Sequence, residues 1–171
     1  MHFDAFESGN YPPLARAGVK LDFNTSVIRS PLQGEKLRLL TSFDPSVSIL
    51  KLFPGIGEQA VKAILSTPGL RGLILETFGS GNAPTDPWLV NALQDAIRRG
   101  ILIVNISQCP GGMVIQGRYE TSKQLAEIGV TGGSDMTTEA ALTKLMLLLG
   151  EFGSEKTKRL ISMSLAGELT G

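Results

Sequence analysis

The spacing of apolar residues changes near residue 46. Before that point Pro, Gly, Asn and Ser interrupt short apolar pieces such as residues 37–40, a pattern that is typical of turns and extended chain. After it, short apolar runs alternate with segments that carry apolar residues every three or four positions. We therefore expect residues 1–46 to form an extended arm or linker with no more than a short strand, and residues 47–171 to form the folded domain.

Continuous apolar runs in the second part predict strands that are covered on both faces. These runs are residues 47–52, 73–75 and 101–106, and a short fourth strand is expected around Val130. Helical spacing predicts helices that include residues 58–66 and 136–149 and a last helix that runs to Leu165. The residues expected to cap helix N-termini are Thr85, Thr121, Asp135 and Ser154.

Strands that alternate with helices at this spacing are typical of βαβ units. The sequence therefore predicts an α/β fold: a three-layer domain with a small, mainly parallel sheet of about four strands flanked by helices. In such sheets the functional side chains lie in the loops that follow the carboxyl ends of the strands. Three loops fit this description, residues 53–57, 76–85 and 107–120.

Composition restricts the chemistry that this domain can perform. Hydrophobic residues make up 42% of the chain, enough to build a core, and sixteen basic residues balance sixteen acidic ones. A net charge of zero argues against a nucleic-acid partner. The only His is His2 and the only Cys is Cys109, which argues against His-dependent catalysis, a His-ligated metal and an internal disulfide. Without a membrane-spanning run or a signal peptide, we expect no membrane partner and a cytoplasmic setting.

One short motif is typical of nucleotide-binding proteins. Gly55, Gly57 and Ala60 form a G-x-G-x-x-A pattern between a predicted strand and a predicted helix, and Glu76 ends the next strand. In a dinucleotide-binding fold the glycines would admit a pyrophosphate and the acid would bind the ribose. The same glycines also suit a tight turn from strand to helix that binds nothing. A stand-alone dinucleotide- or small-ligand-binding module is therefore an alternative interpretation.

Two further loops carry polar side chains at strand ends. The loop after the second strand contains Gly79, Gly81 and Asn82, which together allow close backbone approach and offer an amide for hydrogen bonds. The loop after the third strand contains Ser107, Gln108 and Cys109. Cys109 has no His nearby to activate it, so we expect it to line a site or a core rather than to act as a nucleophile.

Several segments together resemble the C-terminal half of bacterial cytosolic, type I L-asparaginases. The glycine-rich loop within residues 73–84, ending in Gly-x-Gly-Asn, resembles a loop of that family. Residues 104–109 and 129–145 resemble a strand with its turn and the entry into a long helix. The resemblance also includes residues 3–8 and 167–170, so it extends over nearly the whole chain in the family's order.

This resemblance implies a division of labour between two halves of an enzyme. In the family, an N-terminal domain holds the nucleophilic threonines and the Thr-Lys-Asp proton-transfer set, and no segment here resembles those. We therefore expect this chain to partner an N-terminal asparaginase domain in a homo-oligomer, a dimer or tetramer, that hydrolyses L-asparagine to L-aspartate and ammonia. We expect the 171 residues alone to be inactive. The family implies no metal and no organic cofactor.

The resemblance also assigns roles to particular residues. Asn82, and more weakly Tyr119 and Glu120, would bind substrate in the active site of a neighbouring subunit. The residues that match an effector site for asparagine are Glu76, Ser107, Gln108 and Cys109. Regulated bacterial members have Arg at the position of Glu76, where an acid repels the effector carboxylate, so we expect weak or absent activation by asparagine.

Two other interpretations remain open at this point. A related protein of tRNA transamidation shares this architecture, although the balanced charge of the present chain makes direct tRNA contact less favourable. A purely structural oligomerisation domain is also compatible with the sequence.

Overall fold

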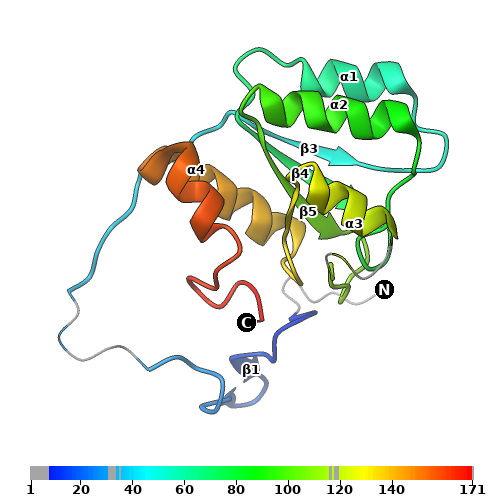
Figure 1. Cartoon of the computed structure of the whole chain (residues 1–171). Helices are drawn as coiled ribbons and strands as arrows, with labels where there is room; N and C mark the ends of the chain where they lie inside the picture. Colours follow the sequence, from blue (N-terminus) through cyan, green and yellow to red (C-terminus); the bar gives the residue numbers. More distant parts are fainter. Residues whose placement is uncertain (1–7, 31–33, 35, 116, 118–119, 171) are drawn as a thin grey trace. The chain divides into compact units, whose positions relative to one another are not determined.

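The computed structural model describes residues 8–30, 34, 36–115, 117 and 120–170, and the chain divides into two compact units, Met1–Leu39 and Leu40–Gly171 (Figure 1). In the first unit, β1 (Ala15–Ala17) pairs with β2 (Leu21–Phe23) as an antiparallel hairpin. The division between the units precedes the end of the predicted arm at residue 46.

A four-stranded sheet forms the centre of the second unit. Its strands are β3 (Val47–Lys51), β4 (Gly72–Thr77), β5 (Leu102–Ser107) and β6 (Thr131–Gly132). They pair in the order β3-β4-β5-β6, and every pair is parallel. The predicted α/β class and the parallel four-stranded sheet are confirmed.

The strand order determines where the helices lie. Each strand pairs with the next one along the chain, and right-handed crossovers then carry every connecting helix over the same face of the sheet. These helices are α1 (Glu58–Leu65), α2 (Pro87–Arg98) and α3 (Glu120–Glu127), and α4 (Thr138–Leu160) follows the last strand and covers the opposite face (Figure 1). No helix in the described part of the chain is long and apolar enough to cross a membrane.

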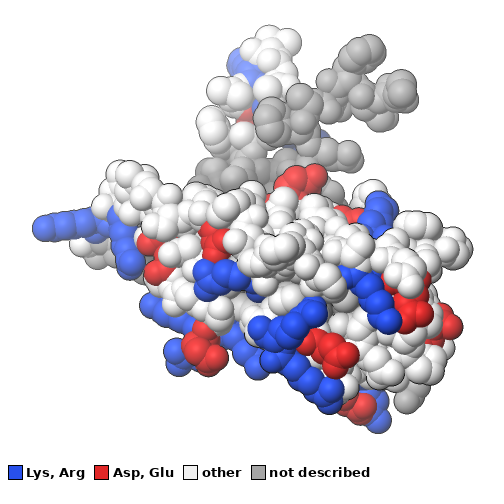
Figure 2. Space-filling model, turned by 90° about the horizontal axis from the view of Figure 1, so that it is seen from above, with Lys and Arg blue, Asp and Glu red and all other residues white. Residues whose placement is uncertain are grey.

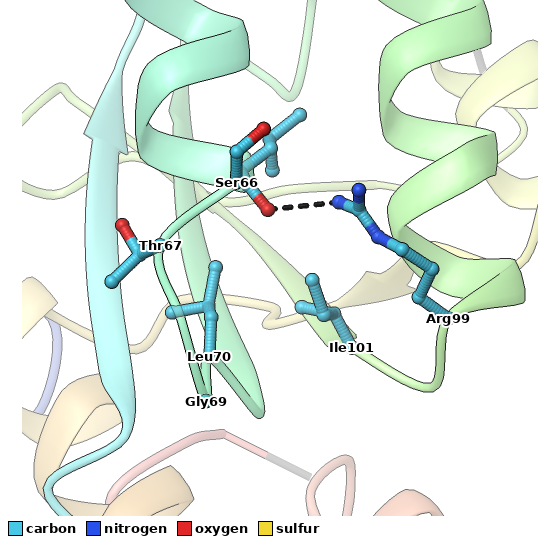
Figure 3. Close-up of a pocket in the computed structure, with 7 residues that line it drawn as sticks. Ser66, Thr67, Gly69, Leu70, Arg99 and Ile101 are labelled. Carbon is cyan, nitrogen blue, oxygen red and sulfur yellow. Dashed lines mark hydrogen bonds between the residues drawn. The ribbon is translucent and has the colours of Figure 1, made fainter.

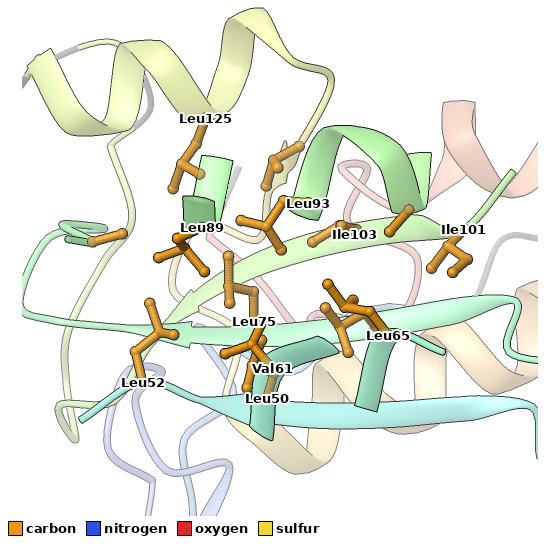
Figure 4. Close-up of a cluster of buried hydrophobic side chains, with 14 residues drawn as sticks. Leu50, Leu52, Val61, Leu65, Leu75, Leu89, Leu93, Ile101, Ile103 and Leu125 are labelled. Atoms are coloured by element: carbon orange, nitrogen blue, oxygen red, sulfur yellow. The ribbon is translucent and has the colours of Figure 1, made fainter. Parts of the chain in front are cut away.

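Two apolar clusters hold these layers together, one on each face of the sheet. Leu75 and Ile103 point toward α1, α2 and α3, where they meet Leu89, Leu93 and other buried side chains (Figure 4). The neighbouring strand residue Ile74 belongs instead to the cluster against α4. Because successive side chains of a strand point to opposite faces, each central strand contains a continuous apolar run, residues 73–75 in β4 and 102–104 in β5, and these runs predicted the strands.

Charges on the helical surface are balanced locally. Lys62 Nζ lies 2.6 Å from Glu58 Oε1 on α1, and Arg98 Nη1 lies 3.2 Å from Asp95 Oδ1 on α2. On the face seen in Figure 2, basic and acidic side chains are interspersed. Among the described residues on this face, opposite charges therefore lie close to one another.

Three of the predicted helix caps are wrong. The N-cap of α2 is Asp86 rather than Thr85, because Pro87 takes the first helical position. Thr121 lies inside α3, whose first residue is Glu120. The N-cap of α4 is Thr137, whose hydroxyl accepts a hydrogen bond from the Ala140 N–H at 3.2 Å, and not Asp135.

A kink at Gly153 divides α4. Gly153 has a left-handed backbone (φ 70°), Ser154 follows directly, and the helix ends at Leu160 rather than at Leu165.

We call residues 41–46 the strap. The N–H groups of Thr41 and Ser42 donate to Glu151 Oε1 at 2.8 and 2.7 Å. The strap is therefore part of the folded unit rather than a free linker.

Candidate functional site

Asn82 lies in a tight loop at the carboxyl end of β4. The Phe78 N–H donates to the Asn82 carbonyl at 2.8 Å, and the Asn82 N–H donates back to the Phe78 carbonyl at 2.8 Å. Gly79 and Gly81 have φ of 51° and 105°, a region that favours glycine. The two hydrogen bonds fix the backbone of Asn82, and its side chain is half-buried at the rim of the sheet.

A buried polar group supports this loop from below. Asn105 on β5 is fully buried, and its Oδ1 accepts a hydrogen bond from Thr77 Oγ1 at 2.7 Å. Its Nδ2 lies 3.5 Å from the Gly81 carbonyl oxygen, and its own carbonyl accepts from the Gly133 N–H at 2.7 Å. Sequence reasoning assigned Asn105 no role, although an amide within an apolar strand is an unusual choice.

Ser107, the last residue of β5, and Gln108 after it make hydrogen bonds that hold the sheet edge together. Ser107 Oγ donates to the Gly79 carbonyl at 2.6 Å and accepts from the Cys109 N–H at 3.0 Å. Gln108 Nε2 donates to the carbonyls of Leu52 at 2.5 Å and Glu76 at 2.9 Å, and so ties the ends of β3 and β4 together. The Cys109 thiol is exposed.

Glu76 points toward α4. Its side chain is 8% exposed, Thr138 Oγ1 donates to Glu76 Oε1 at 2.5 Å, and Lys51 Nζ lies 3.4 Å from Glu76 Oε2. Thr138 is the first residue of α4, whose partial positive charge also favours a carboxylate there. Glu76 therefore joins β3, β4 and α4 at one corner of the domain.

This geometry does not support the dinucleotide interpretation. Gly55 and Gly57 precede α1 on one face of the sheet, whereas the Glu76 carboxylate lies on the face covered by α4. Dinucleotides bind where the strand order of a sheet reverses, and the order β3-β4-β5-β6 has no reversal among the described strands. The two glycines form the strand-to-helix turn, with Gly57 as the N-cap of α1.

The structure brings most of the sequence-predicted residues to one edge. Asn82 follows β4, Ser107 ends the adjacent strand β5, and Gln108 and Cys109 follow it. Glu76 lies near the end of β4. Glu120 begins α3, and its side chain lies outside what the structure describes. Tyr119 also lies outside the described residues.

Asp135 connects this edge to the end of the chain. Its Oδ1 accepts a hydrogen bond from the Thr170 N–H at 2.8 Å, and its Oδ2 accepts from the Thr170 hydroxyl. Burial opposes ionisation, but the hydrogen bonds from Thr170 outweigh it and hold the pKa of Asp135 below its usual value. This contact between residues 35 positions apart left no local sequence signal.

One pocket lies away from this edge. A pocket of about 260 Å³ lies between the C-terminal ends of α1 and α2, next to Leu70 and Ile101, which precede β4 and β5 (Figure 3). Arg99 Nη2 donates to the Leu65 carbonyl there at 2.8 Å, which satisfies one of the free carbonyls at the end of α1. This arginine has a structural task, and the lining shows no catalytic set.

Comparisons with known proteins agree with the resemblance. Residues 46–161 match the glutaminase/asparaginase C-terminal domain. L-asparaginase 1 of Escherichia coli (strain K12) is 40% identical over 98% of this chain and 49% of that protein. The 60 kDa lysophospholipase of Mus musculus is 40% identical over 98% of this chain and 30% of that protein. L-asparaginase I from Vibrio cholerae superimposes with a TM-score of 0.88 and 36% identity, covering 100% of this chain and 52% of that one.

These matches extend over the sheet, its helices and the loops described above. The chain spans about half the length of the E. coli relative and less of the mouse one. The family match covers most of the described second unit. The chain therefore belongs to the glutaminase/asparaginase C-terminal domain family.

Proposed function

We propose that this chain is the C-terminal part of an L-asparaginase and works with an N-terminal half that carries the nucleophiles. The observation that carries the proposal is the match of the whole fold to an L-asparaginase at 36% identity and a TM-score of 0.88. In the reaction, a threonine hydroxyl of the other half attacks the side-chain amide carbon of asparagine, and the C–N bond breaks to release ammonia. Water then hydrolyses the acyl-enzyme to aspartate. No metal or organic cofactor takes part.

In this proposal, residues of this half form one wall of the substrate-binding pocket in a neighbouring subunit. The Asn82 amide can donate and accept hydrogen bonds, and its loop backbone is held at both ends by hydrogen bonds to Phe78. A rigid amide is suited to orient the polar groups of a small amino-acid substrate. Tyr119 and Glu120 are weaker candidates for the same wall. The arrangement requires a homo-oligomer, a dimer or a dimer of dimers, and we place it in the cytoplasm.

The test needs an assembled enzyme. This chain can replace the matching 169 residues of E. coli L-asparaginase 1, and ammonia release from asparagine is then measured. We expect the assembled enzyme to be active and the 171-residue chain alone to release no ammonia. Asn82→Ala should lower kcat/KM about a hundredfold, because a misplaced substrate loses that much.

Asn91→Ala is the matched control, since Asn91 is exposed on α2 away from the sheet edge. Its kcat/KM should equal that of the unmodified enzyme. Ammonia release by the isolated chain would refute the proposed division of labour. An Asn82→Ala enzyme with full activity would refute the role of Asn82.

A second prediction concerns regulation by asparagine. Glu76 is a carboxylate at the proposed effector position, with its partners already supplied by Thr138 and Lys51. Gln108 donates to two backbone carbonyls, and the Ser107 hydroxyl is bonded to Gly79. We therefore expect the assembled enzyme to show a hyperbolic dependence of rate on asparagine. A sigmoidal curve that Ser107→Ala makes hyperbolic would contradict this expectation.

A further inference from the structure

Asn105 is the most unusual side chain near the proposed site. It lies between Val104 and Ile106 on β5 and has no exposed surface. Burying an amide is unfavourable unless hydrogen bonds replace those that water would provide. An apolar residue would fill the same position in the strand at no such cost, so the amide must be compensated by specific partners.

Those partners lie in the strand and the loop that lead to Asn82. Thr77 Oγ1 donates to Asn105 Oδ1 at 2.7 Å and is also 3.3 Å from the Ile106 carbonyl oxygen. Thr77 is the last residue of β4 and is fully buried as well. The hydroxyl and the amide therefore join β4 and β5 through their side chains at the point where the Asn82 loop departs.

The loop rests directly on this pair. Asn105 Nδ2 lies 3.5 Å from the carbonyl oxygen of Gly81, the residue before Asn82. A Cβ added at Gly81 would stand 3.4 Å from Asn105 Nδ2 and 2.9 Å from Val114 Cγ1. There is therefore little free space between Gly81 and the side chains of Asn105 and Val114, and we expect a change in the shape of Asn105 to displace the peptide that leads to Asn82.

We propose that Thr77 and Asn105 are positioning residues that set the place of the Asn82 side chain in the substrate pocket. This inference rests on the proposed function, because it gives Asn82 a substrate to orient. Thr77 and Asn105 touch no substrate themselves. They act through the Gly81 carbonyl and through the joined ends of β4 and β5.

The decisive experiment separates positioning from stability. Removing one partner leaves a buried polar group without a hydrogen bond, but replacing both by apolar groups of similar shape can be nearly neutral for stability. The double variant Thr77→Val/Asn105→Leu in the assembled enzyme should therefore have a urea unfolding midpoint closer to that of the parent than the single variant Thr77→Val has, with the lost bond to the Gly81 carbonyl as the remaining cost. Its kcat/KM should still fall at least tenfold, toward the effect of a misplaced substrate. A merely structural role would restore both quantities together.

A second comparison tests whether the effect passes through Asn82. Added to an Asn82→Ala enzyme, Thr77→Val/Asn105→Leu should lower kcat/KM by no more than about twofold, since residues that act as one unit are not additive. Thr77→Ser keeps the hydroxyl and should retain parental kinetics, whereas Thr77→Val should not. This single-residue pair also serves if the double variant does not fold.

The outcomes distinguish the inference from the function on which it rests. If Asn82→Ala impairs the enzyme while Thr77→Val and Thr77→Val/Asn105→Leu have parental kinetics, the positioning role is refuted and the proposed function stands. Full additivity with Asn82→Ala would refute it too. If Asn82→Ala itself has no effect on kcat/KM, the proposed substrate role of Asn82 is refuted, and the positioning role of Thr77 and Asn105 is refuted with it.

Discussion

Replacing Lys144 with Met is expected to lower the free energy of unfolding by about 3–5 kcal/mol, because it leaves a buried carboxylate without its cation. Lys144 Nζ lies 2.6 Å from Glu168 Oε1 and donates to the Met163 carbonyl at 2.6 Å. The two side chains are only 6% and 13% exposed. Urea unfolding followed by circular dichroism measures the change.

The same pair predicts how the effect depends on pH. Burial would raise the pKa of Glu168, but the hydrogen bonds from Leu165, Lys144 and Ala166 outweigh it and lower the pKa from 4.5 to about 2. A carboxyl whose pKa is lowered by folding adds stability that is fully present above the unfolded value and is lost as pH falls through the folded one. The difference between parent and Lys144→Met should therefore shrink between about pH 4.5 and pH 2.

Two controls make this prediction specific. Lys144→Met/Glu168→Gln removes both charges and should recover most of the lost stability, since no unpaired charge stays buried. Lys158→Met changes an exposed lysine of the same helix and should have an effect within about 0.5 kcal/mol. If Lys144→Met were as mild as Lys158→Met, the pair would not hold the chain end to α4.

The two central strands could be predicted from the sequence because they are buried on both faces. The run at residues 101–106 became β5 (Leu102–Ser107), displaced by a single position. The spacing of apolar residues along the chain shows such burial, even when the residues that cover the strand are unknown. Helix starts were predicted less well, since several residues near each start can serve as caps. At α4, Thr170 binds the carboxylate of Asp135 and leaves the cap to Thr137.

In the candidate site, too, features encoded by neighbouring residues were predicted, and features that depend on distant residues were missed. The Asn82 loop follows from local glycine chemistry, and the structure contains it. The task of Asn105 depends on contacts with Thr77 and Gly81, which are 28 and 24 positions away in the chain. Similarly, the glycines near α1 predicted a nucleotide site only because a short motif carries no information on strand order. Both cases depend on which residues or strands far apart in the chain lie together, and a short stretch of sequence does not show this.

Replacing Gly150 with Ala is expected to release the strap from α4. A Cβ at Gly150 would stand 2.3 Å from the Ser42 carbonyl oxygen and 3.0 Å from the Asp44 nitrogen. These neighbours are backbone atoms and cannot rotate away, so the strap must move. In an exposed helix Gly→Ala ordinarily adds up to about 1 kcal/mol of stability. Here overpacking should reverse the sign and cost about 1–3 kcal/mol.

Release of the strap can also be measured by limited proteolysis. Three sets of contacts hold the strap against the domain. Thr41 and Ser42 donate to Glu151. The Asp44 N–H donates to the Met146 carbonyl at 3.0 Å, and the Asp44 carboxylate forms an ion pair with Arg71. Phe43 within it is half exposed and offers a chymotrypsin site that becomes cleavable only when the surrounding chain opens. Gly150→Ala should speed cleavage after Phe43 about tenfold or more, as expected from a loss of local stability of this size.

Two further variants show whether the steric clash is the cause. Glu151→Ala removes the acceptor for Thr41 and Ser42 without adding an atom, and it should also expose Phe43 to cleavage. Glu155→Ala changes an exposed residue of the same helix and should leave the cleavage rate unchanged. A Gly150→Ala protein that is more stable than the parent and equally resistant to cleavage would mean that the strap does not pack against Gly150. In that case helix propensity, not the docked strap, would determine the residue tolerated there.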